Sequence, residues 1–502
     1  MLFNSYNFML FFPIVLLVYF VIPQKLRYIW LLVVSYYFYM GWNAKYAILI
    51  AFSTIITWLS GLLQGKIQTS DADDDIMIKR KKLVVAFSFI INLGILIFFK
   101  YFDFIFNNIY YVLKLFGTVQ LTNHFDIILP VGISFYTFQA LGYTVDVYRG
   151  DIKPEKNILR YALFVSFFPQ LVAGPIERSK NLLTQVKNVE HIKLWNYDRV
   201  TGGATLMLWG FFQKMVIADR AAILVDTVYN SYWSYGTIEL IIATVLFAIQ
   251  IYCDFGSYSM IAIGAAKVMG FELMENFNTP YFSRSIKEFW RRWHISLSTW
   301  FRDYLYIPLG GSRCSKVKKY RNLMITFLVS GLWHGANWGF IAWGGIHGLY
   351  QIIGDLTKNI RNKVNTKLNV QTSSFGYKFG QVVITFSLAC FAWIFFRLEY
   401  ISSSLSFIKR MFTHWNPWVL FDKSLYNLGL NVTEVHVLVL SLVALFIVDC
   451  IRYRQKMTID AAIFKQVLWF RWLIIFAGFF AILIYGIYGP AFVVKQFIYF
   501  QF

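Results

Sequence analysis

The amino-acid sequence predicts an all-α membrane protein that crosses the bilayer many times. Of its 502 residues, 58% are hydrophobic and 15% are charged, whereas roughly a quarter of the residues of a soluble domain are charged. Apolar runs alternate with short polar segments along the whole chain. Because the bilayer core offers the backbone no hydrogen-bond partners, such runs are expected to be helices. We predict about 11–13 transmembrane or re-entrant helices.

The chain carries a net charge of +21, which in a soluble protein would suggest a nucleic-acid partner. Here, however, Lys and Arg gather between the apolar runs, as in cytoplasmic loops that obey the positive-inside rule and meet anionic lipid. We therefore expect contacts with membrane lipid and none with nucleic acid. The cysteines have no paired spacing, so neither a disulfide framework nor a zinc site is predicted; they are Cys253, Cys314, Cys390 and Cys450.

The first three apolar runs indicate the orientation of the chain. Residues 6–23 follow an N-terminus without Lys or Arg and show no small-residue cleavage site, so they predict a retained helix instead of a signal peptide. A lysine and an arginine come directly after this run, which places the N-terminus outside and the first loop in the cytoplasm. Runs at 28–42 and 46–63 lead outward and back. The loop at 65–82 ends in four consecutive basic residues and is accordingly predicted to be cytoplasmic.

Several of the remaining runs are shorter than the ~20 residues of a full crossing. Broken helices at membrane depth are tolerated only where protein or a water-filled cavity satisfies their backbone, so these runs predict a central cavity. We expect a single membrane domain over 1–502, with a motif-rich core at 127–350, C-terminal helices at 377–502, and linkers at 357–377 and 398–433. The remaining spans are expected at 83–99, 105–116, 127–140, 161–172, 203–217, 238–252, 323–332, 338–353, 381–396, 435–448 and 469–488.

A strongly basic segment at 283–321 is predicted to face the cytoplasm, because it holds ten Lys or Arg residues against two acidic ones. Aromatic and apolar residues recur within it at helical spacing and predict one aromatic-rich helix face. An interfacial amphipathic helix would explain this pattern. The residues on this face are Trp290, Trp293, His294, Leu297, Phe301 and Tyr304.

The arginines of the same segment allow a second interpretation. Guanidinium groups pair with phosphate, so these side chains could receive an anionic ligand from the cytosol. The candidate donor-binding residues are Arg291, Arg292, Arg302 and Arg313.

His334 lies at the end of an apolar run, next to Trp333 and with Asn337 and Trp338 close behind. An ionisable side chain at membrane depth must be satisfied by protein or water and indicates a functional site. Imidazole has a pKa near neutrality and is the usual general base. The alternative is a histidine that only bonds neighbouring helices, and this structural interpretation is favoured for His347 on the next run.

Other chemistries lack their usual sequence signals. There is no HExxH, and no His or carboxylate pair has the ligand spacing of a known metal site, so no metal is expected. A GxSxG elbow, a P-loop and a GxGxxG motif are also missing from the sequence. Asp254 lies at the end of an apolar run, where it could orient a histidine or fix a helix terminus.

Two long segments carry a resemblance to a known family. Residues 252–313 contain YCDFGSYSM, FWRRWH and YIPLGGSR, and residues 330–348 read SGLWHGANWGFIAWGGIHG. Both resemble the membrane-bound O-acyltransferase (MBOAT) superfamily, and within it the membrane subunit of alginate O-acetyltransferase and related bacterial polysaccharide O-acetyltransferases. The opening residues 1–12, LPVGISFYTFQ and AGPIER are similar to the same group. The likeness runs to residue 350, beyond which the chain is merely hydrophobic.

The resemblance implies an MBOAT-type cavity and assigns roles around it. It maps the family's signature histidine onto His334 and its second motif histidine onto His294, which are thereby the candidate catalytic residues. One departure is DFGSYSM at 254–260, where relatives more often read DFSGYSD; the acidic residue is retained. Candidate cavity and supporting residues are Asp254, Trp293, Trp333, Asn337 and Trp338.

The resemblance also implies a reaction. An acetyl thioester, acetyl-CoA, would dock from the cytoplasm as a donor substrate, with its phosphates near the arginines, and no cofactor would be bound. His334 would act as general base or as nucleophile, His294 would position the thioester, and backbone amides or Asn337 would stabilise the oxyanion. A polysaccharide acceptor would approach from outside a bacterial cytoplasmic (inner) membrane, where an extracytoplasmic protein with an SGNH-hydrolase-like domain would complete the transfer.

Two alternatives stay open at this point. The D-alanine transfer proteins of teichoic acid synthesis share FWRRWH and would take an aminoacyl group from a carrier protein, although YIPLGG and AGPIER favour the acetyltransferase branch. A transporter or flippase whose cavity histidines relay protons would need no acyl donor.

Overall fold

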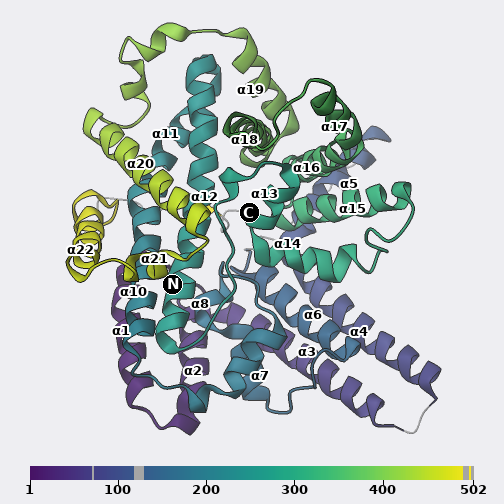
Figure 1. Cartoon of the computed structure of the whole chain (residues 1–502). Helices are drawn as coiled ribbons and strands as arrows, with labels where there is room; N and C mark the ends of the chain where they lie inside the picture. Colours follow the sequence, from purple (N-terminus) through teal and green to yellow (C-terminus); the bar gives the residue numbers. More distant parts are fainter. Residues whose placement is uncertain (71–72, 118–128, 490–496, 499–502) are drawn as a thin grey trace. The chain divides into compact units, whose positions relative to one another are not determined.

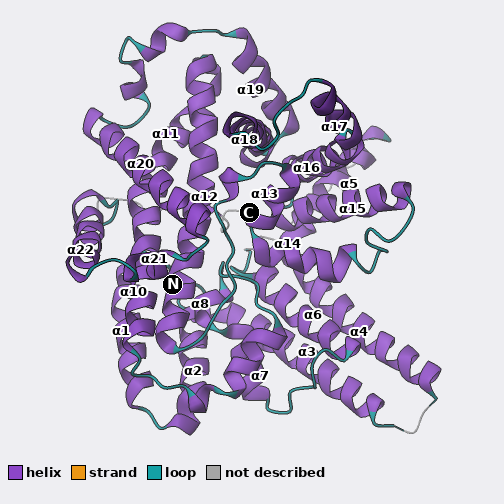
Figure 2. Cartoon of the chain, viewed as in Figure 1, coloured by secondary structure: helices purple, strands orange, loops and turns teal. Residues whose placement is uncertain are grey.

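The computed structural model describes residues 1–70, 73–117, 129–489 and 497–498. These residues form helices and loops, as Figure 2 shows, which confirms the all-α prediction. They group into two compact units, of which the first comprises Met1–Gly203 with Ala262–Met274 and the second Ala204–Ile261 with Glu275–Phe502. The first two residues of the predicted span 127–140 lie outside the described residues. The single domain expected over 1–502 stays a prediction.

Helices of the first unit start at polar caps and continue through apolar sequence. The Ser5 side chain accepts a hydrogen bond from the backbone of Phe8 in α1, and Asn157 caps α7 in the same way. The helices of this unit are α1 (Tyr6–Val21), α2 (Arg27–Met40), α3 (Ala47–Gln68), α4 (Asp74–Leu96), α5 (Phe102–Leu115), α6 (Ile133–Arg149), α7 (Ile158–Ser166), α8 (Phe168–Leu171) and α9 (Thr184–Lys187).

Two helices belong to both units, namely α10 (Tyr197–Phe212) and α12 (Thr237–Met269). The second unit contains the predicted site residues and the C-terminal part of the chain. Figure 1 labels its helices. Its other helices are α11 (Asp219–Asn230), α13 (Ile286–Arg292), α14 (Ile295–Phe301), α15 (Lys316–His334), α16 (Trp338–Leu356), α17 (Lys358–Lys367), α18 (Phe375–Arg397), α19 (Ile401–Thr413), α20 (Val432–Gln455), α21 (Ile459–Phe464) and α22 (Leu468–Tyr485).

Among the described residues, six helical stretches are long and apolar enough to cross a membrane, by length and composition. Several of the other helices, such as α13 and α14 with seven residues each, are too short to cross alone, as the interrupted apolar runs predict. The six stretches are Ala44–Gln68, Asp74–Leu115, Thr237–Met269, Phe375–Arg397, Val432–Gln455 and Leu468–Tyr485.

Several predicted boundaries were wrong because helices extend beyond the apolar runs from which they were predicted. The expected loop at 65–82 is largely helix, and its basic run lies inside α4, where Lys81 donates a hydrogen bond to Gln68 of α3. The run at 238–252 continues to Met269, so that Asp254 lies inside α12 and not at its end. The two expected linkers contain α17 and α19, respectively.

The helices α15 and α16 pack closely because glycines remove the side chains between them. A Cβ atom on Gly331 of α15 would lie 2.3 Å from the carbonyl oxygen of Phe340, and one on Gly344 of α16 would lie 2.3 Å from that of Phe327. Small residues allow such close backbone approach in membrane helices. This contact fixes the end of α15, where His334 lies.

Replacing Gly344 with alanine should lower the thermal unfolding midpoint of the purified protein, because the methyl group must displace the α15 backbone. Overpacking of this kind costs about 1–3 kcal/mol. Gly345→Ala is the matched control, since its Cβ would meet the nearest atom, Leu328 Cδ2, at an ordinary 3.5 Å. Equal midpoints for the two variants, measured by tryptophan fluorescence in detergent, would contradict the packing argument.

Candidate functional site

His294 occupies a turn between two short helices. Its backbone has a φ of +42°, in the left-handed region that residues other than glycine adopt only at a cost in free energy. The turn therefore ends α13 and starts α14, and the continuous helix that the aromatic spacing predicted was wrong at this point. The imidazole is completely buried.

The loop that follows α12 holds this turn through backbone hydrogen bonds. The amide of Asn278 donates to the carbonyl of Arg292 at 2.9 Å, and the amide of Ile295 donates to the carbonyl of Asn276 at 2.9 Å. These two bonds bracket His294. A left-handed residue other than glycine needs surrounding contacts to hold its conformation, and these two bonds provide them from another part of the chain.

The side chain of Asn276 adds two more contacts to the same turn. It accepts a hydrogen bond from the Ser296 hydroxyl at 2.6 Å and donates one to the Ser259 hydroxyl on α12 at 2.9 Å. All three side chains are buried, where an unmade hydrogen bond is expensive. The sequence analysis missed Asn276, although the Asn-Thr-Pro run at 278–280 is a turn signal that points to this loop.

His334 is the last residue of α15, and Gly335 continues the chain in an extended conformation. A Cβ on Gly335 would lie 2.1 Å from the ring of Phe340, so only glycine fits between the histidine and the next helix. The His334 ring contacts Trp343 and Phe396, with centroids 5.0 and 5.3 Å away. The helix end and its aromatic neighbours thus fix the imidazole.

The structure brings the two candidate catalytic histidines together. Their ring centroids are 6.5 Å apart, and the indole of Trp333 contacts both rings, at 5.9 Å from His294 and 5.0 Å from His334. On its other side, His294 meets the ring of Phe255 at 4.7 Å. Two imidazoles in one aromatic enclosure can bind, orient and exchange protons with a substrate that reaches them.

Burial determines the protonation state of His294, which lies outside the six candidate spans. Desolvation lowers the pKa of its imidazole to about 3, because the charged form loses its hydration. The ring is therefore neutral at physiological pH and presents one nitrogen as donor and one as acceptor. A neutral imidazole is the form that accepts a proton or attacks a carbonyl.

The other expected cavity residues lie in varied environments. Trp293 is buried against Phe289 and Trp393, with centroids 5.4 and 5.0 Å away. Asn337 caps α16 by accepting a hydrogen bond from the Phe340 amide at 3.0 Å. Trp338 is 52% exposed, so its indole does not share the enclosure of the histidines.

Asp254 belongs to a buried ion pair, which neither sequence-based alternative foresaw. Its carboxylate lies 2.5 Å from the ammonium of Lys214 and also accepts a hydrogen bond from the amide of Ile498 at 2.6 Å. Lys214 is in the π-helical stretch Gln213–Ala218 and pairs with Asp219 at 2.9 Å as well. The sequence analysis missed Lys214, which a search for ionisable residues in apolar runs would have found.

The four candidate donor-binding arginines differ in their existing contacts. Arg291 and Arg313 are exposed, and Arg302 is exposed beside Asp303, 2.7 Å away. Arg292 is partly buried, pairs with Glu288 at 3.0 Å and is thereby engaged within the protein. Three of the four are thus on the surface, where an anion could meet them.

His347 has a structural environment. It accepts a hydrogen bond at Nδ1 from the indole of Trp290 at 3.2 Å, and its ring stacks on Phe289 at 6.0 Å. These contacts join α13 to α16 and match the structural interpretation of this histidine.

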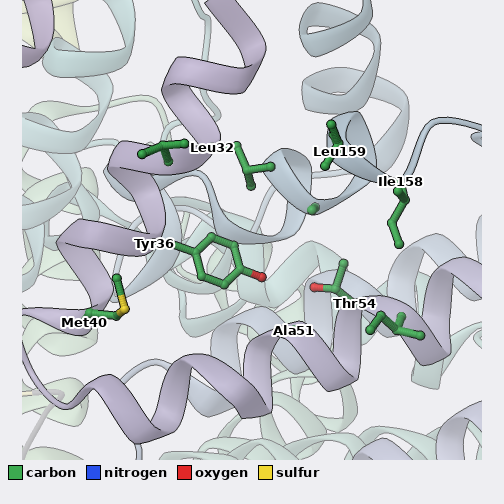
Figure 3. A pocket seen from close by; sticks show the side chains of 10 residues that line it. Leu32, Tyr36, Met40, Ala51, Thr54, Ile158 and Leu159 are labelled. Atoms are coloured by element: carbon green, nitrogen blue, oxygen red, sulfur yellow. The ribbon is translucent and has the colours of Figure 1, made fainter.

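A pocket of about 500 Å³ lies in the first unit, between α2, α3 and α7. Figure 3 shows the hydroxyl of Tyr36 directed toward Thr54 within a lining that is otherwise aliphatic or sulfur-containing. No charged residue and none of the predicted site residues lines it, so it is not suited to the phosphates of a coenzyme. The central cavity inferred from sequence stays a prediction.

Comparison with known proteins identifies the family. The family described as "MBOAT, membrane-bound O-acyltransferase family" matches residues 153–396. A probable alginate O-acetylase AlgI of Pseudomonas aeruginosa is 38% identical over 437 residues, which cover 86% of this chain and 79% of that protein. The chain belongs to the membrane-bound O-acyltransferase family. The predicted resemblance is confirmed, but its expected limit at residue 350 was wrong, because the family match runs to residue 396. The protein is a multi-pass membrane acyltransferase.

Two further relatives of this membrane-bound O-acyltransferase carry different names. A peptidoglycan O-acetyltransferase of Helicobacter pylori is 34% identical over 413 residues, which cover 76% of this chain and 73% of that protein. A teichoic acid D-alanyltransferase of Streptococcus thermophilus is 31% identical over 264 residues, which cover 50% of this chain and 61% of that protein.

Asn276→Ala should destabilise the turn at His294, because two buried hydroxyl partners lose their bonds. The expected cost is about 1–3 kcal/mol. Asn278→Ala is the control, since the Asn278 side chain is exposed and its backbone makes the contact. Thermal unfolding in detergent should show a lower midpoint for Asn276→Ala alone. Equal midpoints for the two variants would contradict a stabilising role of the Asn276 side chain.

Proposed function

We propose that this membrane-bound O-acyltransferase takes an acetyl group from cytoplasmic acetyl-CoA and passes it across the bacterial inner membrane for O-acetylation of a cell-surface polysaccharide. The observation that carries the proposal is the pair of buried histidines, 6.5 Å apart, beside a strongly basic exposed segment. The names of the alginate and peptidoglycan relatives support the acceptor class.

The chemistry assigns different tasks to the two histidines. His334 accepts the proton of the acceptor hydroxyl as the hydroxyl oxygen forms a bond to the acetyl carbonyl carbon. The C–S bond of the thioester then breaks, and the released thiolate takes up a proton. If His334 instead attacks first, its ring nitrogen carries the acetyl group until the hydroxyl displaces it. His294, neutral and fixed by its turn, positions the thioester. The developing oxyanion is stabilised by backbone amides or by the Asn337 side chain.

Coenzyme A is too polar to enter the bilayer, so only its acetyl end reaches the histidines. Its phosphates bind at the exposed arginines of the basic segment, among which Arg291, Arg302 and Arg313 are accessible. Arg292 supports the segment through its pair with Glu288. The donor is a substrate that leaves after each turnover, and no resident cofactor is needed.

On the outer side, the acceptor is a polysaccharide, and an extracytoplasmic protein with an SGNH-hydrolase-like domain completes the transfer. The similarity of the chain to a probable alginate O-acetylase and to a peptidoglycan O-acetyltransferase supports the polysaccharide acceptor. The similarity to the D-alanyltransferase of Streptococcus thermophilus, which spans half of the chain, supports a second candidate, in which a carrier protein delivers an aminoacyl group to the same histidines.

Release of acetate or transfer of acetyl from radiolabelled acetyl-CoA by the purified protein in nanodiscs tests the proposal. We expect His334→Ala to lower turnover by about 100-fold or more while donor binding persists, because general base catalysis contributes on this scale. His294→Ala should lower turnover and weaken donor binding together. His414→Ala is the control, since His414 is exposed and distant in sequence from the motifs. Wild-type protein that neither binds nor turns over acetyl-CoA, with an acceptor present, would instead favour the carrier-protein reaction.

Replacing Arg291 or Arg313 with glutamine should raise the KM for acetyl-CoA several-fold, about the effect of losing one exposed charge contact to phosphate, with little change in kcat. The effect should shrink for acetyl-pantetheine, which lacks the nucleotide phosphates. Arg361→Gln on α17 removes an exposed arginine outside the segment and serves as the control. A KM effect of equal size for the donor without phosphates would contradict the assignment.

A further inference from the structure

Two charged residues lie buried on α20, in the part of the chain beyond the recognised motifs. Asp449 and Arg452 are 6% and 5% exposed, one helical turn apart in a candidate membrane span. Charges are expensive to bury, and a buried ion pair is weak support for stability by itself. Their presence therefore requires contacts that an apolar pair could not make.

Those contacts reach the loop that follows α12 and α12 itself. Arg452 Nη2 donates a hydrogen bond to the carbonyl oxygen of Phe277 at 3.2 Å. The Tyr252 hydroxyl of α12 hydrogen-bonds to both carboxylate oxygens of Asp449, at 3.2 and 3.0 Å. Asp449 and Glu275 lie 4.0 and 3.9 Å from the guanidinium and balance its charge.

Phe277 is the central residue of the loop that holds His294. Its neighbours on either side, Asn276 and Asn278, make the two backbone hydrogen bonds that bracket the left-handed turn. Its ring contacts Trp293 at 4.9 Å and stacks beside His294 at 6.5 Å. A displacement of the Phe277 carbonyl would therefore disturb the two backbone hydrogen bonds and move the Phe277 ring that packs beside the imidazole.

The neighbouring residue of α20 touches the same turn directly. The Tyr453 ring lies under the Arg292 guanidinium, 5.1 Å from its centre, and against Phe282 at 5.3 Å. Arg292 in turn donates hydrogen bonds to the Asn278 carbonyl and the Thr279 hydroxyl, at 3.3 and 3.1 Å. The end of α20 thus contacts both the loop that follows α12, through Phe277, and the end of α13, through Arg292.

We propose that Arg452, oriented by Asp449, is a positioning residue for acyl transfer: by holding the Phe277 carbonyl it keeps His294 in its left-handed turn, facing His334. The inference rests on the proposed role of His294 in holding the donor thioester. It places part of the site's support in the C-terminal helices. Arg452 touches no reacting atom and acts through the loop.

The test compares Arg452→Gln with Arg454→Gln in the full-length protein in nanodiscs. Both changes remove one positive charge from the same end of α20, but Arg454 is exposed. The first readout is chemical modification of His294 by diethyl pyrocarbonate, which acylates accessible neutral imidazoles, quantified by mass spectrometry of the peptide. His347, buried and bonded to Trp290, is the internal reference.

We expect Arg452→Gln to raise the modification rate of His294 about tenfold, the population effect of losing one charge-assisted hydrogen bond, and to leave His347 unchanged. Arg452→Lys, which keeps the charge, should restore part of the protection. Equal His294 reactivity in wild type and Arg452→Gln would overturn the proposal. A parallel rise at His347 would also overturn it, because it would show general loosening of the unit.

The second readout is the kinetics of acetyl transfer. Arg452→Gln should raise the KM for acetyl-CoA, whereas the KM of Arg454→Gln should stay at the wild-type value. If Arg452→Gln does not fold, Asp449→Asn, which keeps an acceptor for Tyr252, replaces it with the same expected pattern at reduced size. Failure of the proposed function would abolish transfer in the wild type as well. The reactivity of His294 would still report on its positioning, so the two failures are distinguishable.

Discussion

The candidate site depends on a left-handed turn that the rest of the unit forces on a histidine. Two backbone hydrogen bonds from residues 276 and 278 bracket His294, and the buried side chain of Asn276 reinforces them. Such a conformation costs free energy and persists only where surrounding contacts determine it. In the proposed reaction the benefit is preorganisation, since the imidazole would be oriented before a substrate arrives and would need no ordering at the moment of reaction.

The second histidine is fixed by a different physical device. His334 ends a helix whose partner approaches so closely that glycines are required at the crossing, and the rigid helix pair carries the imidazole to its aromatic neighbours. One residue is thus set by a strained loop and the other by tight helix packing. Because Trp333 contacts both imidazole rings, a shift of the turn at His294 or of the helix pair α15 and α16 would change the aromatic surroundings of both histidines.

Sequence reasoning predicted the class of fold, and it selected two histidines whose rings the structure places 6.5 Å apart, because composition and long motifs carry that information. It failed where structure depends on contacts between distant segments. The aromatic spacing around His294 predicted one helix, but the hydrogen bonds from residues 276–278 divide it into two. Asp254 was expected near a helix end and lies instead in a buried ion pair with Lys214, 40 residues away in sequence. The expected loop at 65–82 and the expected linker at 357–377 contain helix, and polar side chains tie these helices to their neighbours: Lys81 donates to Gln68 and Asn365 donates to Tyr377.

The left-handed backbone at His294 also limits which amino acids can replace this residue during evolution. If a descendant of this chain lost its chemistry but kept its fold, position 294 would accept mainly glycine, asparagine or aspartate, the residues that tolerate a left-handed backbone. Position 334, in ordinary helical conformation, carries no such restriction. In divergent homologues that have lost activity, the identity of residue 294 would therefore show whether the left-handed turn is retained or has been lost.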